Sequence, residues 1–283
     1  MLNQENIKSM TVASTALMTV TGVLLVSLSL SAEPRKTSGF RWAGEEIFYS
    51  AEISGTEAAR ASIRAGKVQK TRSGASYIPI SAKAITHGFF AKSYPVNDNG
   101  DTFIHPKTGM PIKADKFLKE DGGSRAYKVR YEPAKKLAKV VKTIGKKERV
   151  FERAVPEETY DAFSWLYALR NKPLKVNDKY VFYVYDGWKL SRLHIKVVGQ
   201  EKVWTPLGYY PSIKLDIDRE ILNSRWEGKG KDRTVKLKTR IKPKYFATLY
   251  LSADEIKIPV RVFITSKMGD ADFKLIKYTP PKS

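Results

Sequence analysis

Ile213-Lys214-Leu215-Asp216-Ile217-Asp218 alternates apolar and charged residues one by one, and this pattern decides the fold class. Successive side chains of a β-strand point to opposite faces, so the stretch predicts a strand with one buried and one solvated face. The same alternation occurs at 127–131, 192–197 and 256–264. Stretches of this kind follow one another through most of the chain, which is typical of an antiparallel sheet.

Short turn sequences separate the predicted strands. Asn99-Gly100, Asp121-Gly122-Gly123 and Asp186-Gly187 each predict a tight connection between two strands. No stretch rich in Pro, Gly or Ser is long enough to be a linker, so we expect residues 33–283 to form a single β-rich domain. We therefore predict an all-β fold, either an antiparallel barrel or a strongly curved half-barrel.

Residues 157–171 break the alternation and predict one inserted helix. Pro156 suits a first helical turn, while Glu157, Glu158 and Asp161 complement the positive end of the helix dipole. Apolar residues share one face of this helix: Tyr160, Phe163, Leu166 and Tyr167. Because a lone aromatic face must be buried against the sheet, we expect the helix at the mouth or on the concave face of the β structure.

The first 32 residues have the layout of an export signal. A polar start with one basic residue, Lys8, precedes an uncharged segment and an exit of small residues. We predict cleavage near Ser31 or Ala32 and a periplasmic or otherwise exported protein. The uncharged residues 11–32 are also long enough to span a bilayer, so the alternative is an inner-membrane anchor that leaves the domain facing the periplasm.

The chain carries 51 Lys and Arg against 29 Asp and Glu, a formal net charge of +22. Such an excess favours anionic partners. Behind an export signal these are anionic lipid, lipopolysaccharide or another envelope polymer, or an envelope protein, rather than nucleic acid. Alternating basic residues such as Lys236, Lys238 and Arg240 are alternatively a solvated outer face that discourages aggregation.

No sequence motif for catalysis or metal binding stands out. The chain has no cysteine, which excludes disulfides, thiol catalysis, cysteine-bound metal and a lipid-modified N-terminal cysteine. His87, His105 and His194 do not have the spacing of metal ligands, and no G-x-S-x-G nucleophile motif occurs. We expect no metal, no cofactor and no enzymatic activity; a hydrolase without a recognisable motif remains an alternative.

Aromatic residues provide the one candidate ligand site. The stretch 180–185 is apolar on both faces, so it predicts a strand that is covered on both sides. Together with the predicted helix it supplies six candidate ligand-binding residues: Phe163, Trp165, Tyr167, Tyr183, Tyr185 and Trp188. Tyrosine and tryptophan suit a pocket that is apolar inside and wet at its lip, and the alternative is ordinary core packing.

Several short motifs, taken in their order along the chain, carry a family resemblance. They are 44–49 (GEEIFY), 55–61 (GTEAARA), 207–213 (LGYYPSI), 249–254 (LYLSAD), 258–262 (IPVRV) and 269–275 (GDADFKL). Over about residues 44–278 the chain resembles the bacterial domain-of-unknown-function family 3108. The resemblance implies an exported envelope protein with a largely antiparallel, barrel-like fold, and it implies no catalytic residues and no ligand.

Two main functions follow from these observations. In the first, a non-enzymatic envelope protein binds a lipid or other apolar ligand in an aromatic-lined β cavity, while its basic exterior faces anionic envelope components. In the second, a structural or scaffolding periplasmic protein has a filled barrel and binds a partner protein or an anionic polymer.

Overall fold

The computed structural model describes residues 40–120, 122–228, 233–265 and 270–281, and the predicted signal segment 1–32 lies outside these residues. The strands of one half are β1 (Glu46–Ile53), β2 (Thr56–Ala65), β3 (Gln69–Lys70), β4 (Ser76–Thr86), β5 (Asn97–Ile104), β6 (Pro111–Glu120), β7 (Gly123–Glu132), β8 (Leu137–Ile144) and β9 (Lys147–Ala154). The others are β10 (Thr159–Tyr160), β11 (Lys179–Tyr185), β12 (Leu190–Thr205), β13 (Gly208–Glu227), β14 (Thr234–Ser252), β15 (Pro259–Ile264) and β16 (Ala271–Thr279). The described part of the chain also contains three short helical segments: α3 (Gly88–Ser93), η2 (Pro133–Lys135) and α4 (Ser164–Arg170).

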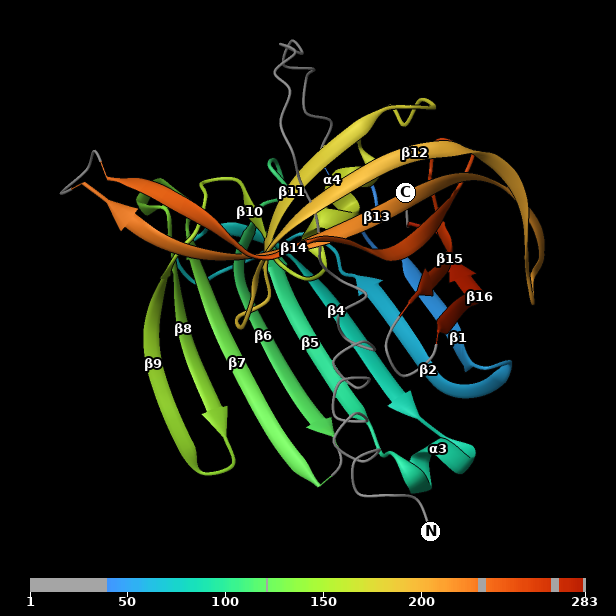
Figure 1. The fold of residues 1–283 in the computed structure, drawn as a ribbon, viewed down its shortest axis with the longest axis horizontal. Helices are drawn as coiled ribbons and strands as arrows, with labels where there is room; N and C mark the ends of the chain where they lie inside the picture. Colours follow the sequence, from blue (N-terminus) through green and yellow to red (C-terminus); the bar gives the residue numbers. More distant parts are fainter. Residues whose placement is uncertain (1–39, 121, 229–232, 266–269, 282–283) are drawn as a thin grey trace.

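All these strands belong to one curved sheet system, as Figure 1 shows. The strand order is β10-β11-β12-β13-β14-β15-β16-β1-β2-β4-β5-β6-β7-β8-β9, with the short β3 paired to β4. Neighbouring strands are antiparallel, apart from the parallel β10 and β11. The predicted all-β fold is confirmed, and of its two forms the structure has the strongly curved half-barrel, because the sheet does not close.

The alternation in the sequence corresponds to the two faces of this sheet. In β13, Ile213, Leu215 and Ile217 are buried, and in β7 the buried residues include Tyr127 and Val129. Their charged neighbours lie on the outer face, as expected for a strand with one wet side. The concave face therefore carries the hydrophobic core.

Side-chain contacts hold the two unpaired ends of the sheet near each other. The hydroxyl of Tyr131 on β7 donates to the carbonyl oxygen of Tyr185 on β11 at 2.6 Å. Trp226 near the end of β13 donates its indole N–H to the carbonyl oxygen of Lys136, 3.2 Å away, beside η2. In Figure 1 the long β13–β14 hairpin accordingly extends over the upper ends of β7, β8 and β9.

The predicted turns have different outcomes. Asp186-Gly187 does connect β11 to β12, and Gly187 has a positive φ of 88°. The prediction of a hairpin at Asn99-Gly100 is wrong, because both residues lie within β5 and pair with β4 and β6. Gly100 allows close packing instead: a Cβ atom there would lie 3.1 Å from the ring of Phe163, which is a tight contact.

The inserted helix lies inside the curved sheet, as Figure 1 shows for α4, but it is shorter than the predicted 157–171. Thr159 and Tyr160 form β10, which pairs with β11, so strand pairing replaces the first predicted turn. Asp161 then accepts a hydrogen bond from the backbone N–H of Ser164 at 2.8 Å, while the Ser164 hydroxyl accepts one from the Asp161 N–H at 3.0 Å. This reciprocal pair resembles a capping box and explains why the helix begins at Ser164.

A buried ion pair fixes the end of α4. The guanidinium of Arg170 donates to both carboxylate oxygens of Glu45, at 2.7 and 2.5 Å, and neither side chain is exposed to solvent. The guanidinium also stacks on Trp42, 4.7 Å from its ring centroid, and the hydroxyl of Tyr278 on β16 donates to Glu45 at 3.1 Å. The pair thus joins the segment before β1, the helix and the last strand.

Among the described residues, no helix combines the length and the apolar character needed to cross a membrane.

Removing one partner of the buried pair should strongly destabilise the fold. We expect Glu45→Gln and Arg170→Met each to lower the free energy of unfolding by about 3–5 kcal/mol, because each leaves an unpaired polar or charged group in the core. The double variant should lose less than the sum of the two single losses. Urea unfolding of the wild type, the two single variants and the double variant measures this coupling. The prediction is wrong if each single variant loses less than about 1 kcal/mol and the double variant loses the sum of the two.

Candidate functional site

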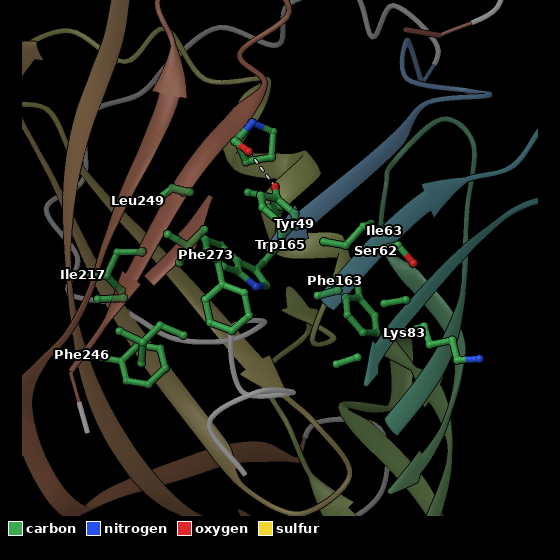
Figure 2. A pocket seen from close by; sticks show the side chains of 18 residues that line it. Tyr49, Ser62, Ile63, Lys83, Phe163, Trp165, Ile217, Phe246, Leu249 and Phe273 are labelled. Carbon is green, nitrogen blue, oxygen red and sulfur yellow. Dashed lines mark hydrogen bonds between the residues drawn. The ribbon is translucent and has the colours of Figure 1, made fainter. Parts of the chain in front are cut away.

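An apolar cavity of about 50 Å³ lies between α4 and the concave face of the sheet. Its walls come from both halves of the chain, and Figure 2 shows Phe163 and Trp165 facing Phe246 and Phe273 across it. The lining residues are Tyr49, Ala61, Ser62, Ile63, Ala82, Lys83, Ala84, Phe163, Trp165, Leu166, Ile217, Phe246, Ala247, Leu249, Pro259, Val262, Ile264 and Phe273. The polar ends of Ser62 and Lys83 point away from it in Figure 2, so the interior is almost wholly apolar.

Trp165 is the main polar feature of the cavity wall. Its side chain is 3% exposed, and its indole N–H has no hydrogen-bond partner among the described residues. In Figure 2 its ring projects from α4 into the space between Phe163 and Phe273. A buried donor without a partner costs about 1–3 kcal/mol, so an acceptor oxygen on a ligand would relieve this cost.

The residues just before α4 position the aromatic wall. The buried carboxylate of Asp161 accepts hydrogen bonds from the hydroxyl of Thr102 on β5 and from the N–H of Ser164. Burial raises the pKa of Asp161, while these hydrogen bonds lower it. Because Asp161 ties the start of the helix to β5, Phe163 lies directly over Gly100.

Of the six predicted site residues, the structure brings Phe163 and Trp165 together in the cavity. Tyr167 lies on the other side of α4, where its ring contacts Phe40 and Trp42, and it borders a separate, polar opening of about 660 Å³.

The remaining three predicted residues lie on or beside β11. Tyr185 is fully buried, and its hydroxyl donates to the carbonyl oxygen of Gly187 at 3.1 Å. Tyr183 is half-buried, with the guanidinium of Arg192 over its ring. Trp188 is 39% exposed and lines a cleft of about 480 Å³ beside β8 and β9. The six residues therefore contribute to several different environments.

Sequence reasoning missed the opposite wall of the cavity. Phe246 on β14 and Phe273 on β16 line it, and neither residue was a candidate from the sequence. The pairing of β1 with β16 brings this wall toward the N-terminal strands, and a pairing across more than 200 residues leaves no local signal.

The three histidines occupy separate places. His87 contacts Glu57 at 3.0 Å, and His105 accepts backbone N–H groups of its own turn. His194 lies 3.5 Å from Glu220, and burial lowers its pKa. Within the described ranges, no group of three or more His, Asp or Glu residues is arranged to hold a metal ion.

Two carboxylates lie close together on the inner face near the β6–β7 connection. Asp98 is fully buried and accepts a hydrogen bond from the backbone N–H of Lys119 at 2.9 Å. Burial, together with the nearby Glu120 carboxylate, raises the pKa of Asp98 to about 7, although Lys116 and Arg125 oppose this shift. Arg125 also forms an ion pair with Glu120.

The raised pKa of Asp98 predicts a pH-dependent stability. Between about pH 4 and pH 7 the folded chain holds a proton that the unfolded chain has released, so the free energy of unfolding should fall as pH rises. We expect Asp98→Asn to be more stable than the wild type by on the order of 2 kcal/mol at pH 8, with the difference vanishing near pH 4.

Chemical unfolding at several pH values measures this difference. Asp101→Asn is the matched control, because Asp101 lies on the exposed face of the same strand. A constant difference between Asp98→Asn and the wild type from pH 4 to pH 8 would show that Asp98 ionises normally.

Comparison with known proteins agrees with this fold. A crystal structure of a beta-barrel-like protein of the domain of unknown function DUF1849 from Brucella abortus is similar with a TM-score of 0.51 at 10% identity, covering 86% of this chain and 99% of that one. A Bacteroides fragilis protein described as exported with a YmcC-like fold matches with a TM-score of 0.30 at 12% identity, covering 86% of this chain and 100% of its own. A Parabacteroides distasonis protein described as a lipoprotein matches at 0.33 and 10% identity, with coverages of 87% and 100%.

At these identities the Brucella protein indicates a shared fold and nothing about activity, and the other two similarities are too low to carry an argument. None of the curated proteins compared with the chain matches it. The sequence profile described as Protein of unknown function (DUF3108) matches residues 46–276, most of the chain. The expected resemblance is thereby confirmed: the chain belongs to the DUF3108 family.

Proposed function

We propose that this protein is a non-enzymatic, exported envelope protein that binds an apolar ligand on the concave face of its half-barrel. The observation that carries the proposal is the apolar cavity beneath α4, with the unpartnered indole N–H of Trp165 in its wall. An apolar chain that bears one acceptor oxygen, such as an acyl ester or a long-chain alcohol, suits both features. The export signal predicted in residues 1–32 supports the envelope location.

The size of the cavity limits how such a ligand would bind. About 50 Å³ is less than the 150 Å³ of a known cavity that binds benzene, so the space as it stands admits only the end of a chain. Binding of a longer segment therefore needs α4 or the Phe163 ring to move. Because the ring lies over the bare backbone of Gly100, its contact there has no side chain to displace.

The small volume of the cavity also supports a second candidate function. Most ligand sites have volumes of roughly 300–1,000 Å³, far above this cavity. The buried α4 and the Glu45–Arg170 pair also fill the interior, as a scaffolding protein with a filled barrel would require. In that function the protein would bind an envelope protein or an anionic polymer through its basic surface, to which Lys236, Lys238 and Arg240 on β14 contribute.

Tryptophan quenching separates these two functions. A brominated, uncharged long-chain alcohol should quench the fluorescence of the purified protein when it enters the cavity. Trp165→Phe should remove most of this quenching, whereas the matched Trp204→Phe, at a 46% exposed position, should leave it.

A cavity-filling variant provides the second arm. Ala84→Leu places extra carbon atoms in the cavity and should abolish quenching, while Ser81→Leu on the outer face of the same strand should not. Quenching that survives both Ala84→Leu and Trp165→Phe would disprove binding in the cavity and favour the filled barrel. Circular dichroism of each variant checks that the fold is retained.

A further inference from the structure

The cleft beside β8 and β9 is distinct from the cavity and has a different chemistry. It measures about 480 Å³, within the range of ligand sites, and shares no lining residue with the cavity. Its lining includes four cationic side chains, Lys142, Lys147, Arg149 and Arg153, and one acidic residue, Glu148. The same cleft contains apolar surface from Ile144, Phe151 and Trp188.

Charges on β9 are sorted by face. Lys147, Arg149 and Arg153 share the alternation of Phe151, which packs against the core, and so they lie on the inner face. Glu148 and Glu152 alternate with them and so point to the opposite face, and Glu148, near the start of the strand, also borders the cleft. A strand whose charges served solubility alone would not need positive side chains inside and negative ones outside.

The register places like charges opposite each other on the inner face. Lys142 on β8 pairs directly with Arg149 on β9. Like charges at opposite positions of an antiparallel pair destabilise a sheet. Among the described residues, none of the four cations of the cleft forms an ion pair with a carboxylate, and the Nε atom of Arg153 is buried without a hydrogen-bond partner.

Further cationic side chains lie next to residues of the cleft. The ring of Tyr127 lies 5.5 Å from the Lys142 ammonium and 5.0 Å from that of Lys116. Lys189 lies 4.0 Å from the centroid of the Trp188 ring, and burial together with Arg219 lowers the Lys189 pKa. Asp186 partly balances these charges through its contact with Lys116 at 3.9 Å.

We propose that this cleft binds an oxyanion, a phosphate or a carboxylate, carried on an apolar group. The facing cations Lys142 and Arg149 would hold the oxyanion, with Arg153 as a further donor, because charge-assisted hydrogen bonds to oxyanions are among the strongest in proteins. Phe151 and Trp188 would contact the attached apolar group. The ligand relieves the repulsion between facing cations, which explains why the inner face tolerates them. This site does not depend on occupancy of the cavity.

Calorimetric titration of the full chain with three probes tests the proposal. Decyl phosphate, below its micellar concentration, carries both the oxyanion and the chain; inorganic phosphate and decanol each carry one of them. We expect decyl phosphate to bind at least about tenfold more tightly than either of the others. Its affinity should also fall as salt is raised from 0.1 M toward 1 M.

Two double variants with the same loss of charge locate the binding. Lys142→Ala with Arg149→Ala should weaken decyl phosphate binding about tenfold or more. Lys128→Ala with Arg130→Ala, on the exposed outer face of β7, should change it less than about twofold, since it alters only the general positive field. Equal losses in the two double variants would overturn the proposal.

Further variants and probes test the apolar part of the ligand. Trp188→Ala should weaken binding of decyl phosphate but leave inorganic phosphate unchanged. Equal affinity of the wild type for inorganic phosphate and decyl phosphate would overturn the proposed apolar group. Lys147→Glu changes an exposed residue and leaves the core intact. It should also lower the affinity for decyl phosphate, and misfolding of the double variant would not explain that loss.

Discussion

The buried contact between Glu45 and Arg170 is the interaction on which the concave face depends. Arg170 ends α4, Glu45 precedes β1, and Tyr278 on β16 completes the cluster, so one ion pair holds the helix against the paired strands β1 and β16. A bidentate pair with no solvent contact is stable only when its geometry is satisfied, because the cost of removing both charges from water is high. The position of α4, and with it the wall formed by Phe163 and Trp165, follows from this requirement.

With α4 held there, the concave face divides into two chemically different parts. Around the helix the inner residues are small or aromatic, and Ala82, Ala84, Phe163 and Phe273 leave an apolar cavity. Across one row of the sheet, paired residues change from Ala82 and Gly100 to Lys116, Tyr127, Lys142 and Arg149. The turn at Gly187 packs on Tyr127 between the two parts. An open sheet allows this, because its unpaired end strand keeps access to water that a closed barrel would exclude.

The sequence was a good guide where a local pattern determines the structure. Alternation predicted the strands and the buried residues of β7 and β13, and the aromatic segment predicted an inserted helix. It failed at Asn99-Gly100, where a turn sequence lies in mid-strand, paired with β4 and β6 and packed closely under the Phe163 ring. The predicted helix was too long because Thr159 and Tyr160 pair with β11, a strand that comes later in the chain. Contacts between distant segments decided each of these cases.

The same limit explains why the sequence left two interpretations of the excess of positive charge, a surface for anionic partners and a solvated outer face. Alternating cations on β14 and on β9 look alike as text, and both groups include exposed side chains. Lys236 on β14 pairs with Glu227, whereas the cations of β9 line a cleft and have no carboxylate partner among the described residues. Only the knowledge of which face turns inward separates a solvated surface from a binding site. For this protein the face on which a charge lies therefore says more about its partners than the net charge of +22. Cations that face each other on the inner side of the sheet destabilise it, and a bound anion would offset that repulsion.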